Sequence, residues 1–354
     1  MEEKMVHTKR LTIVAAVILA LAAAMAVLMI VLQPGQFDAE IRKTVATLEG
    51  EPELDLTLAV VTDIHYDPSK EEPATVNETC AAVRMIGQQL AKSGRRIDAL
   101  WNLGDFINGH NTTKAQAVDQ IRTVIAAEEK VTADFHNIEG NHDTNIHATF
   151  ESNAGYPETE VLSVPELNAE LENTRTAQTE HHNAKRPTDY YVDFPAIRVI
   201  CVSADETTFM PETEAWLRNE ALETNHEVLI LSHVPTRPEW GFREDVVNGE
   251  AMEAAVFDFI AGGGTVIAWI HGHDHGDMIN TAVSGDGSAR FHEVGIGCAR
   301  FQFPTSNGTP GMTYRERNRD DETMILFDIV TISRAGRTVR FTRVGAGEDR
   351  EISY

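Results

Sequence analysis

Residues 56–65 read LTLAVVTDIH, a short run of apolar and β-branched residues that ends in an aspartate and a histidine. A run of this kind is typical of a buried strand. The same order recurs along the chain, with a polar cluster at the end of each apolar run. The clusters are Asp63-Ile64-His65, Gly104-Asp105, Gly140-Asn141-His142-Asp143, His233 and Gly272-His273-Asp274-His275.

The segments between these clusters alternate between strand and helix patterns. Strands are predicted at residues 56–61, 97–103, 131–138, 190–202 (two strands that turn at Pro195), 228–231, 265–270, 323–332 and 338–344, and helices at residues 74–90, 114–127, 211–222 and 251–260. This alternation implies a layered α/β fold. Because ligands bind at the carboxyl ends of strands in open α/β sheets, the five clusters are expected to converge on one site.

Two segments interrupt the alternation. Residues 148–187 are polar, with a weak helical pattern at 166–174, and this insertion is either a wall or lid of the substrate site or a surface loop. Residues 280–303 are rich in glycine around 284–288, and no regular element is predicted there.

Composition excludes several classes of protein. A length of 354 residues with 42% hydrophobic residues allows one or two domains with a sizeable core. The formal net charge of -25 and the lack of a Lys/Arg run argue against binding to a nucleic acid backbone. Three widely spaced cysteines, Cys80, Cys201 and Cys298, do not form a disulfide framework.

The N-terminus has the pattern of a membrane anchor. Residues 11–32 are apolar except for Thr12, which is long enough for a helix that crosses a bilayer. Lys4, Lys9 and Arg10 precede this run, so residues 1–10 are expected in the cytoplasm and the rest of the chain outside. A cleaved signal peptide, which would make the protein secreted, is the alternative. Residues 33–53 are interpreted as a stalk or a short helix, and residues 54–354 as the catalytic domain.

No single cluster has enough ligands for a closed metal site, but together they supply enough for two ions. Carboxylate, imidazole and amide oxygen groups suit Mn, Fe, Zn, Co or Ni, and two adjacent metals are a common means of hydrolysing phosphate esters. In an extended backbone, side chains two residues apart share a face, which would place Asp63 beside His65 and His273 beside His275. Taken alone, His233 would more often be a core histidine than a ligand.

The clusters, in this order, resemble the motifs of the calcineurin-like metallophosphoesterase superfamily, over about residues 56–341. The resemblance implies a two-sheet β sandwich flanked by helices, a four-layer fold with two metal ions, Mn, Fe or Zn, at one end. It also implies roles for individual residues. Asp63, His65 and His275 would hold one metal, Asn141, His233 and His273 the other, and Asp105 both; His142 would donate a proton to the leaving group and Asp143 would orient His142.

The expected function is a membrane-anchored phosphoesterase in which a hydroxide between the two metals attacks a phosphate monoester or diester, with phosphodiesters favoured. The alternative is an inactive member of the same fold that acts as a binding or scaffold protein. A two-metal amide hydrolase is disfavoured because the motif order is that of phosphoesterases. The sequence assigns no role to Asn108, His110 or His271, and it determines neither the substrate nor the oligomeric state.

Overall fold

The computed structural model describes residues 35–51, 54–69, 72–132, 134–146, 158–172, 179–237, 246–301 and 317–354. Contacts group Glu40–Tyr354 into one compact unit, separate from Met1–Ala39. The predicted membrane anchor, residues 11–32, lies outside the described residues. Among the described residues, no helix has both the length and the hydropathy needed to span a membrane.

The first sheet of the compact unit has six strands. Their order is β13-β12-β11-β1-β2-β3, with bounds β1 Leu56–Val61, β2 Ala99–Asn102, β3 Phe135–Asn137, β11 Leu326–Ser333, β12 Thr338–Gly345 and β13 Arg350–Ser353. The neighbours β1, β2 and β3 are parallel, whereas β1 pairs with β11 in the antiparallel sense. The carboxyl ends of β1, β2 and β3 therefore lie at the same edge of the sheet.

The second sheet has seven strands in the order β4-β5-β6-β7-β8-β10-β9. Their bounds are β4 His181–His182, β5 Tyr190–Asp193, β6 Ile197–Val202, β7 Glu227–Ser232, β8 Val266–His271, β9 Asp277–Val283 and β10 Arg290–Ile296. The strands β6, β7, β8 and β10 run parallel to one another. Both sheets thus combine parallel and antiparallel pairs.

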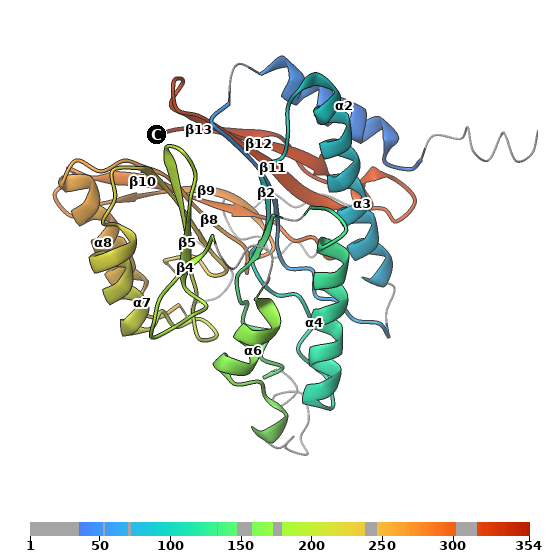
Figure 1. Cartoon of the computed structure of the whole chain (residues 1–354), viewed down its shortest axis with the longest axis horizontal. Coiled ribbons are helices and arrows are strands. Elements are labelled where there is room, and N and C mark those ends of the chain that lie inside the picture. The colour runs from blue at the N-terminus through green and yellow to red at the C-terminus, as the bar shows by residue number, and fades with distance from the viewer. Residues whose placement is uncertain are drawn as a thin grey trace, which may run out of the picture. The chain divides into compact units, whose positions relative to one another are not determined.

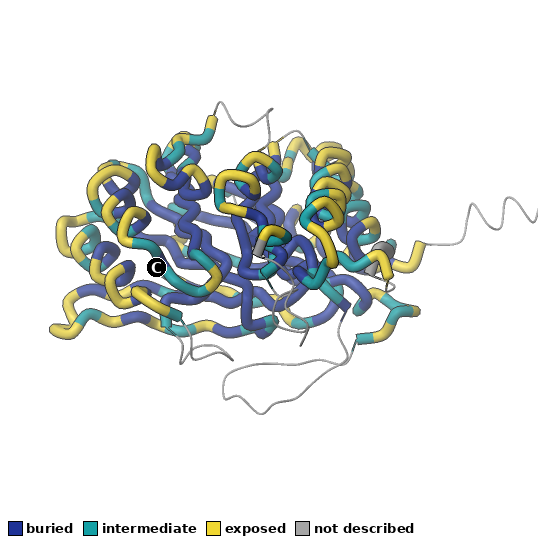
Figure 2. The backbone as a smooth tube through the Cα atoms, turned by 90° about the horizontal axis from the view of Figure 1, so that it is seen from below, coloured by how far each residue is buried: buried dark blue, intermediate teal, exposed yellow. Residues whose placement is uncertain are grey.

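Alternating side chains divide the core into layers. In β6, Val199 and Cys201 pack between the two sheets, together with β1 and β11 residues such as Val60 and Val330. The alternate residues Ile200 and Val202 pack on the opposite face. This period of two is the geometry of a strand that is buried on both faces, and the strands are accordingly the most deeply buried part of the chain (Figure 2).

Helices lie outside the sheets. α3 (Glu72–Leu90) and α4 (Lys114–Glu128) lie beside the first sheet, and α7 (Pro211–Trp216) and α8 (Gly249–Ala261) beside the second (Figure 1). The chain continues α7 as a π-helix, Leu217–Ala221, and forms short 3-10 turns at Ala91–Ser93, Glu158–Glu160 and Glu322–Met324. α4 begins at a capping box in which Thr113 and Gln116 bond to each other's backbone. The predicted two-sheet sandwich with flanking helices is confirmed.

Three segments add detail to the sequence analysis. The segment at 33–53 contains a helix, α2 (Asp38–Gly50), which buries Ile41, Val45 and Leu48. The insertion contains α6 (Val164–Leu171), which packs against α4. The glycine-rich segment, where no element was predicted, forms the hairpin of β9 and β10, and Asp286 Oδ1 caps its turn by accepting hydrogen bonds from Ser284 Oγ and Ser288 N.

Candidate metal centre

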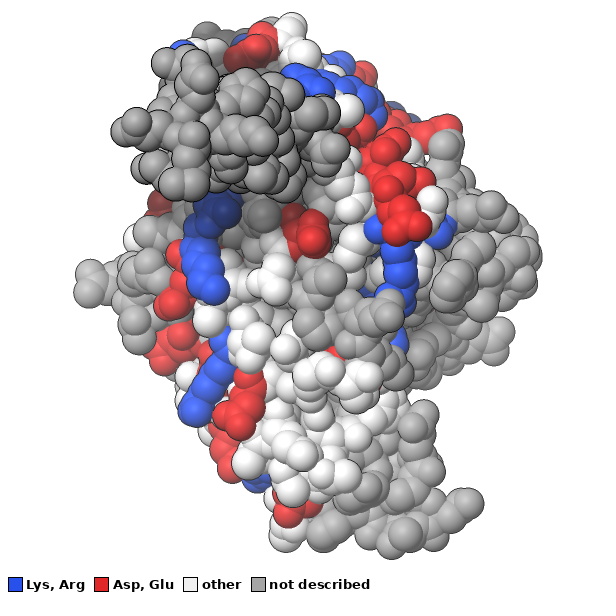
Figure 3. All heavy atoms as spheres, turned by 90° about the vertical axis from the view of Figure 1, so that its right-hand side faces the viewer, with Lys and Arg blue, Asp and Glu red and all other residues white. Residues whose placement is uncertain are grey.

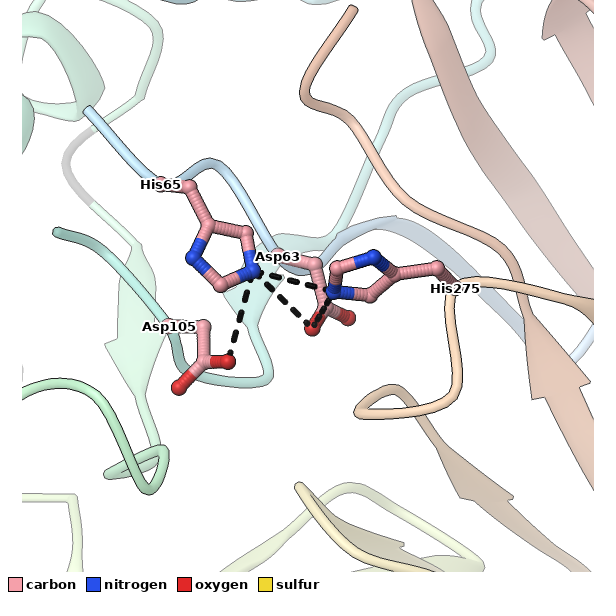
Figure 4. Close-up of side chains that lie close together, drawn as sticks. All are labelled: Asp63, His65, Asp105 and His275. Atoms are coloured by element: carbon pink, nitrogen blue, oxygen red, sulfur yellow. Dashed lines mark hydrogen bonds and ion pairs between the residues drawn. The ribbon is translucent and has the colours of Figure 1, made fainter. Parts of the chain in front are cut away.

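Four of the predicted ligands lie together. The ligand atoms of Asp63, His65, Asp105 and His275 are all within 4.8 Å of one another, and their side chains point toward one another (Figure 4). His65 Nε2 lies 2.9 Å from His275 Nε2, and His275 Nε2 lies 3.1 Å from Asp63 Oδ1. The sequence placed all four in one site, three of them on the first metal and Asp105 on both.

The other three predicted ligands form a second group. Asn141 Oδ1 lies 3.0 Å from His233 Nε2 and 2.8 Å from His273 Nδ1. Asp105 connects the two groups, because its Oδ2 lies 3.5 Å from His65 Nε2 and 3.3 Å from His233 Nε2. One carboxylate therefore faces both sets of ligands, as expected of a residue that bridges two ions.

The two sheets bring these seven side chains together. Each ligand follows the carboxyl end of a strand: Asp63 and His65 follow β1, Asp105 follows β2, Asn141 follows β3, His233 follows β7, and His273 and His275 follow β8. Backbone hydrogen bonds join these loops within one sheet, as from Gly272 N to His233 O at 2.9 Å, and between the two sheets, as from Ala299 N to Thr62 O at 2.9 Å. The ligands are thus held by the ends of five strands from both sheets.

The backbone at the ligands differs from the extended form that the sequence analysis assumed. Asp63, His65, Asp105, His273 and His275 have φ angles of 53°, 46°, 56°, 66° and 56°. Residues other than glycine rarely adopt this left-handed region, and they persist there only where the surroundings hold them. The two Asp/His-x-His pairs do converge, but through left-handed turns and not through an extended strand, because β1 and β8 end before the ligands begin.

Two glycines let the loops approach closely. A Cβ atom on Gly140 would lie 2.2 Å from Asp105 N, and one on Gly272 would lie 2.5 Å from Asp63 Oδ2. Both distances are shorter than real Cβ contacts, so only glycine fits at either position without displacing a ligand. The glycines of the motifs therefore have a steric role at the metal centre.

His142 lies at the rim of the centre. Its Nδ1 is 2.8 Å from the carbonyl oxygen of Asn108, and its Nε2 is 3.9 Å from Asp105 Oδ2. A carbonyl oxygen only accepts hydrogen bonds, so Nδ1 carries a hydrogen and Nε2 is the atom that faces the site. Asn108, which had no role in the sequence analysis, thus orients the His142 ring.

Asp143 is buried beside the centre and holds the backbone of two ligand loops. Its carboxylate accepts hydrogen bonds from Gly140 N at 2.7 Å, Asp105 N at 3.0 Å and Ile107 N at 3.3 Å. These contacts position the loop that carries Asp105 against the loop that carries Asn141 and His142.

The surroundings of three predicted ligands shift their pKa values, and these shifts bear on how a cation would bind. Burial lowers the pKa of His65 well below its usual value, so its imidazole is neutral and can coordinate. Burial acts to raise the pKa of Asp105, but the rings of His233 and His142 outweigh it and hold that pKa well below its usual range. For His233, burial acts to lower the pKa, and Asp105 raises it to about 9, so a metal that binds there must displace a proton.

The residues present fit a pair of metal ions. Three carboxylate or amide groups and four imidazoles converge, and Asp63, Asp105, His233 and His273 are at most 4% exposed. Buried carboxylates and imidazoles of this density are stable together when they share a cation, and mixed nitrogen and oxygen sets suit first-row transition metals.

Sequence reasoning missed Arg300 and the hydrogen-bonding role of Asn108. Arg300 N donates to Asp63 O at 3.0 Å, and its guanidinium Nη1 donates to Asn108 Oδ1 at 3.0 Å. Arg300 comes directly after the apolar run Val294–Ala299, which includes the end of β10, so the strand-end rule that revealed the other clusters could have found it. His271 is buried in β8, where its Nδ1 lies 3.0 Å from Gly272 O.

The sequence profile described as "Calcineurin-like phosphoesterase" matches residues 56–277. The chain belongs to this family. It is therefore a metal-dependent phosphoric ester hydrolase, and the predicted resemblance is confirmed. No curated protein sequence is similar enough to count as a relative.

One solved structure shares the fold at low sequence identity. A dimetal phosphatase from Danio rerio is similar with a TM-score of 0.59 and 15% identity, over 85% of this chain and 100% of that one. A structure described as a candidate 5′-nucleotidase from Staphylococcus aureus, in complex with α-ketoglutarate, has 12% identity to this chain and a TM-score of 0.36. The match covers 84% of this chain and 54% of that one.

Proposed function

We propose that this calcineurin-like phosphoesterase hydrolyses a phosphate monoester or diester, with phosphodiesters favoured, at a centre of two metal ions. The observation that carries the proposal is the position of Asp105, whose Oδ2 lies 3.5 Å from His65 Nε2 and 3.3 Å from His233 Nε2. Mn, Fe or Zn bound there would lower the pKa of a water molecule and offset charge on the phosphate oxygens.

The side chains around the metal ligands have separate tasks in this proposal. Asp143 keeps the two loops in register through three backbone amides. His142 is held by the Asn108 carbonyl at 2.8 Å and directs Nε2 into the site. A proton on Nε2, the ring nitrogen that faces the site, would pass to the oxygen of the departing alcohol.

We also propose that residues 11–32 anchor the protein in a membrane with the catalytic domain on the outer side. The support is the sequence: 22 consecutive residues are apolar except for Thr12, and the positive residues Lys4, Lys9 and Arg10 precede them. Extraction of membranes with carbonate at high pH would leave an anchored protein in the pellet, and protease added to intact cells would remove the domain. A protein that begins after residue 32 when isolated would instead show cleavage and secretion.

The test of the catalytic proposal uses the full-length chain in detergent, stripped of metal and reloaded with Mn, Zn or Fe. Turnover of an aryl phosphate monoester is compared with that of the matching diester, with Asp105→Asn as the variant. We expect metal-dependent turnover that falls by at least about 100-fold in the variant, since its bridging carboxylate is lost. A folded wild-type protein that binds two metals per chain but turns over neither ester would favour the scaffold alternative.

A further inference from the structure

A cleft of about 470 Å³ lies beside His142. It is enclosed by residues 66–69 after β1, residues 108–112 after β2 and one face of α4. His142 is adjacent, because its ring bonds to the carbonyl of Asn108, which lines the cleft, and lies 6.1 Å from the ring of His110, which also lines it. An alcohol that leaves on the His142 side of the metal centre would therefore lie next to this cleft.

The lining of the cleft is polar and acidic. It contains the carboxylates of Asp67 and Asp119, the imidazole of His110, the aromatic ring of Tyr66, and amide and hydroxyl groups. The residues that α4 contributes recur at helical spacing and so form one face: Gln116, Asp119, Gln120 and Thr123. Among the described residues that line it, none is a lysine or an arginine.

The basic residues of α4 do not line the cleft but pair with acidic residues of α6. Lys114 Nζ lies 2.9 Å from a carboxylate oxygen of Glu166, and Arg122 Nε lies 2.7 Å from one of Glu170, both on α6. Figure 3 views the molecule from the side on which α3 and α4 lie in Figure 1, and its basic side chains lie next to acidic ones.

In contrast to the acidic cleft, the metal centre has a positively charged side chain, Arg300, on one side. The guanidinium of Arg300 lies 3.0 Å from Asn108 Oδ1, at the border between the centre and the cleft. One phosphoryl group would thus meet two metal ions and Arg300, while the group attached to it would meet carboxylates, amides and hydroxyls. A second phosphate or a carboxylate in the cleft would be repelled by Asp67 and Asp119.

We propose that this cleft binds the leaving group, and that it selects phosphate esters of polar alcohols that are uncharged or cationic over those that carry a further negative charge. This inference rests on the proposed function. In the reaction a water molecule gives up one proton to solvent and its oxygen bonds to phosphorus. The bond between phosphorus and the alcohol oxygen breaks, and the alcohol leaves with a proton from His142, which regains one from solvent.

The experiment compares three phosphate monoesters with the full-length, metal-loaded enzyme. The alcohol is uncharged in glycerol 2-phosphate, cationic in phosphocholine and anionic in 2-phosphoglycerate, and an aryl phosphate reports the basic activity. We expect kcat/KM for 2-phosphoglycerate to be lower than for glycerol 2-phosphate by about tenfold, and the difference to shrink in high salt. Asp119→Lys should reduce this difference by at least about threefold.

Glu223→Lys is the matched control, because Glu223 is an exposed acidic residue that does not line the cleft. It changes the net charge by the same amount and should leave the ratio between the substrates unchanged. Activity on the aryl phosphate with no discrimination by leaving-group charge, or an equal effect of both variants, would overturn this inference alone. Absence of turnover of every ester would instead overturn the proposed function.

Discussion

Replacing Gly140 with alanine should disturb the metal centre without changing any ligand. The new Cβ would lie 2.2 Å from Asp105 N and 2.3 Å from Asp105 Oδ1, whereas real Cβ contacts essentially never fall below 3.0 Å. Relief of the clash requires a displacement of 3.0 − 2.2, or about 0.8 Å, between the two loops. Neither loop can yield alone, because Asp143 bonds to Gly140 N at 2.7 Å and to Asp105 N at 3.0 Å.

The displacement acts on the carboxylate that faces both sets of ligands. A misplacement near 1 Å costs about 100-fold in rate, and overpacking costs about 1–3 kcal/mol of stability. We therefore expect Gly140→Ala to remain folded but to lose about 100-fold in kcat/KM for an aryl phosphate, with weaker binding of metal. The assays are steady-state kinetics over a metal titration, metal content by atomic emission, and urea unfolding of the metal-free protein.

Gly285→Ala is the control, because no heavy atom lies within 4 Å of its added Cβ. It should retain wild-type kinetics, metal content and stability. If Gly140→Ala bound two metals and kept at least about half of the wild-type kcat/KM, the close approach would not position Asp105, and our account of the site would be refuted. The 100-fold expectation would then have no structural basis.

Two further predictions concern stability. Burial raises the pKa of Glu128 from 4.5 to about 8. Between these pH values the folded protein keeps a proton that the unfolded chain loses. The free energy of unfolding therefore falls as pH rises through this range, by up to about 5 kcal/mol. Glu128→Gln should flatten this fall in urea unfolding between pH 5 and 8.5, and an equal slope would contradict the prediction. Arg343 is 1% exposed and pairs with Asp328 at 2.9 Å. Because Arg343→Met leaves Asp328 buried without this partner, it should lower the free energy of unfolding by about 3–5 kcal/mol. A decrease no larger than that caused by Arg122→Met, at an exposed position, would contradict this prediction.

The seven candidate ligands could be picked out from the sequence because each follows a strand end. Apolar runs that stop at Asp63, Asp105 and His233 mark the carboxyl ends of strands, and parallel neighbours bring such ends to one edge. The left-handed backbone at Asp63 and His273 was not predictable in this way. Sequence spacing gives the order of side chains, but φ at a loop residue is set by the loops that pack against it.

Contacts between distant segments could not be predicted from the sequence for the same reason. The guanidinium of Arg300 reaches Asn108 across 192 positions, and the buried Arg186 joins Ser203 to Glu139, the residue before Gly140. Each pair depends on the register of two sheets rather than on a local pattern. The hairpin of β9 and β10 was missed because its glycine-rich turn conceals two strands whose alternation is short.

The sequence by itself determined the family, the seven candidate ligands and the alternation of strands and helices, since these depend on residue type and spacing along the chain. Tertiary structure alone decided the distances from Asp105 to the two ligand groups, the hydrogen bond by which Asn108 orients His142, and a cleft beside His142 whose described lining has no lysine or arginine. The physical reason is that ligand identity is a local property, whereas distance, burial and electric field depend on which loops the packing of two sheets brings together.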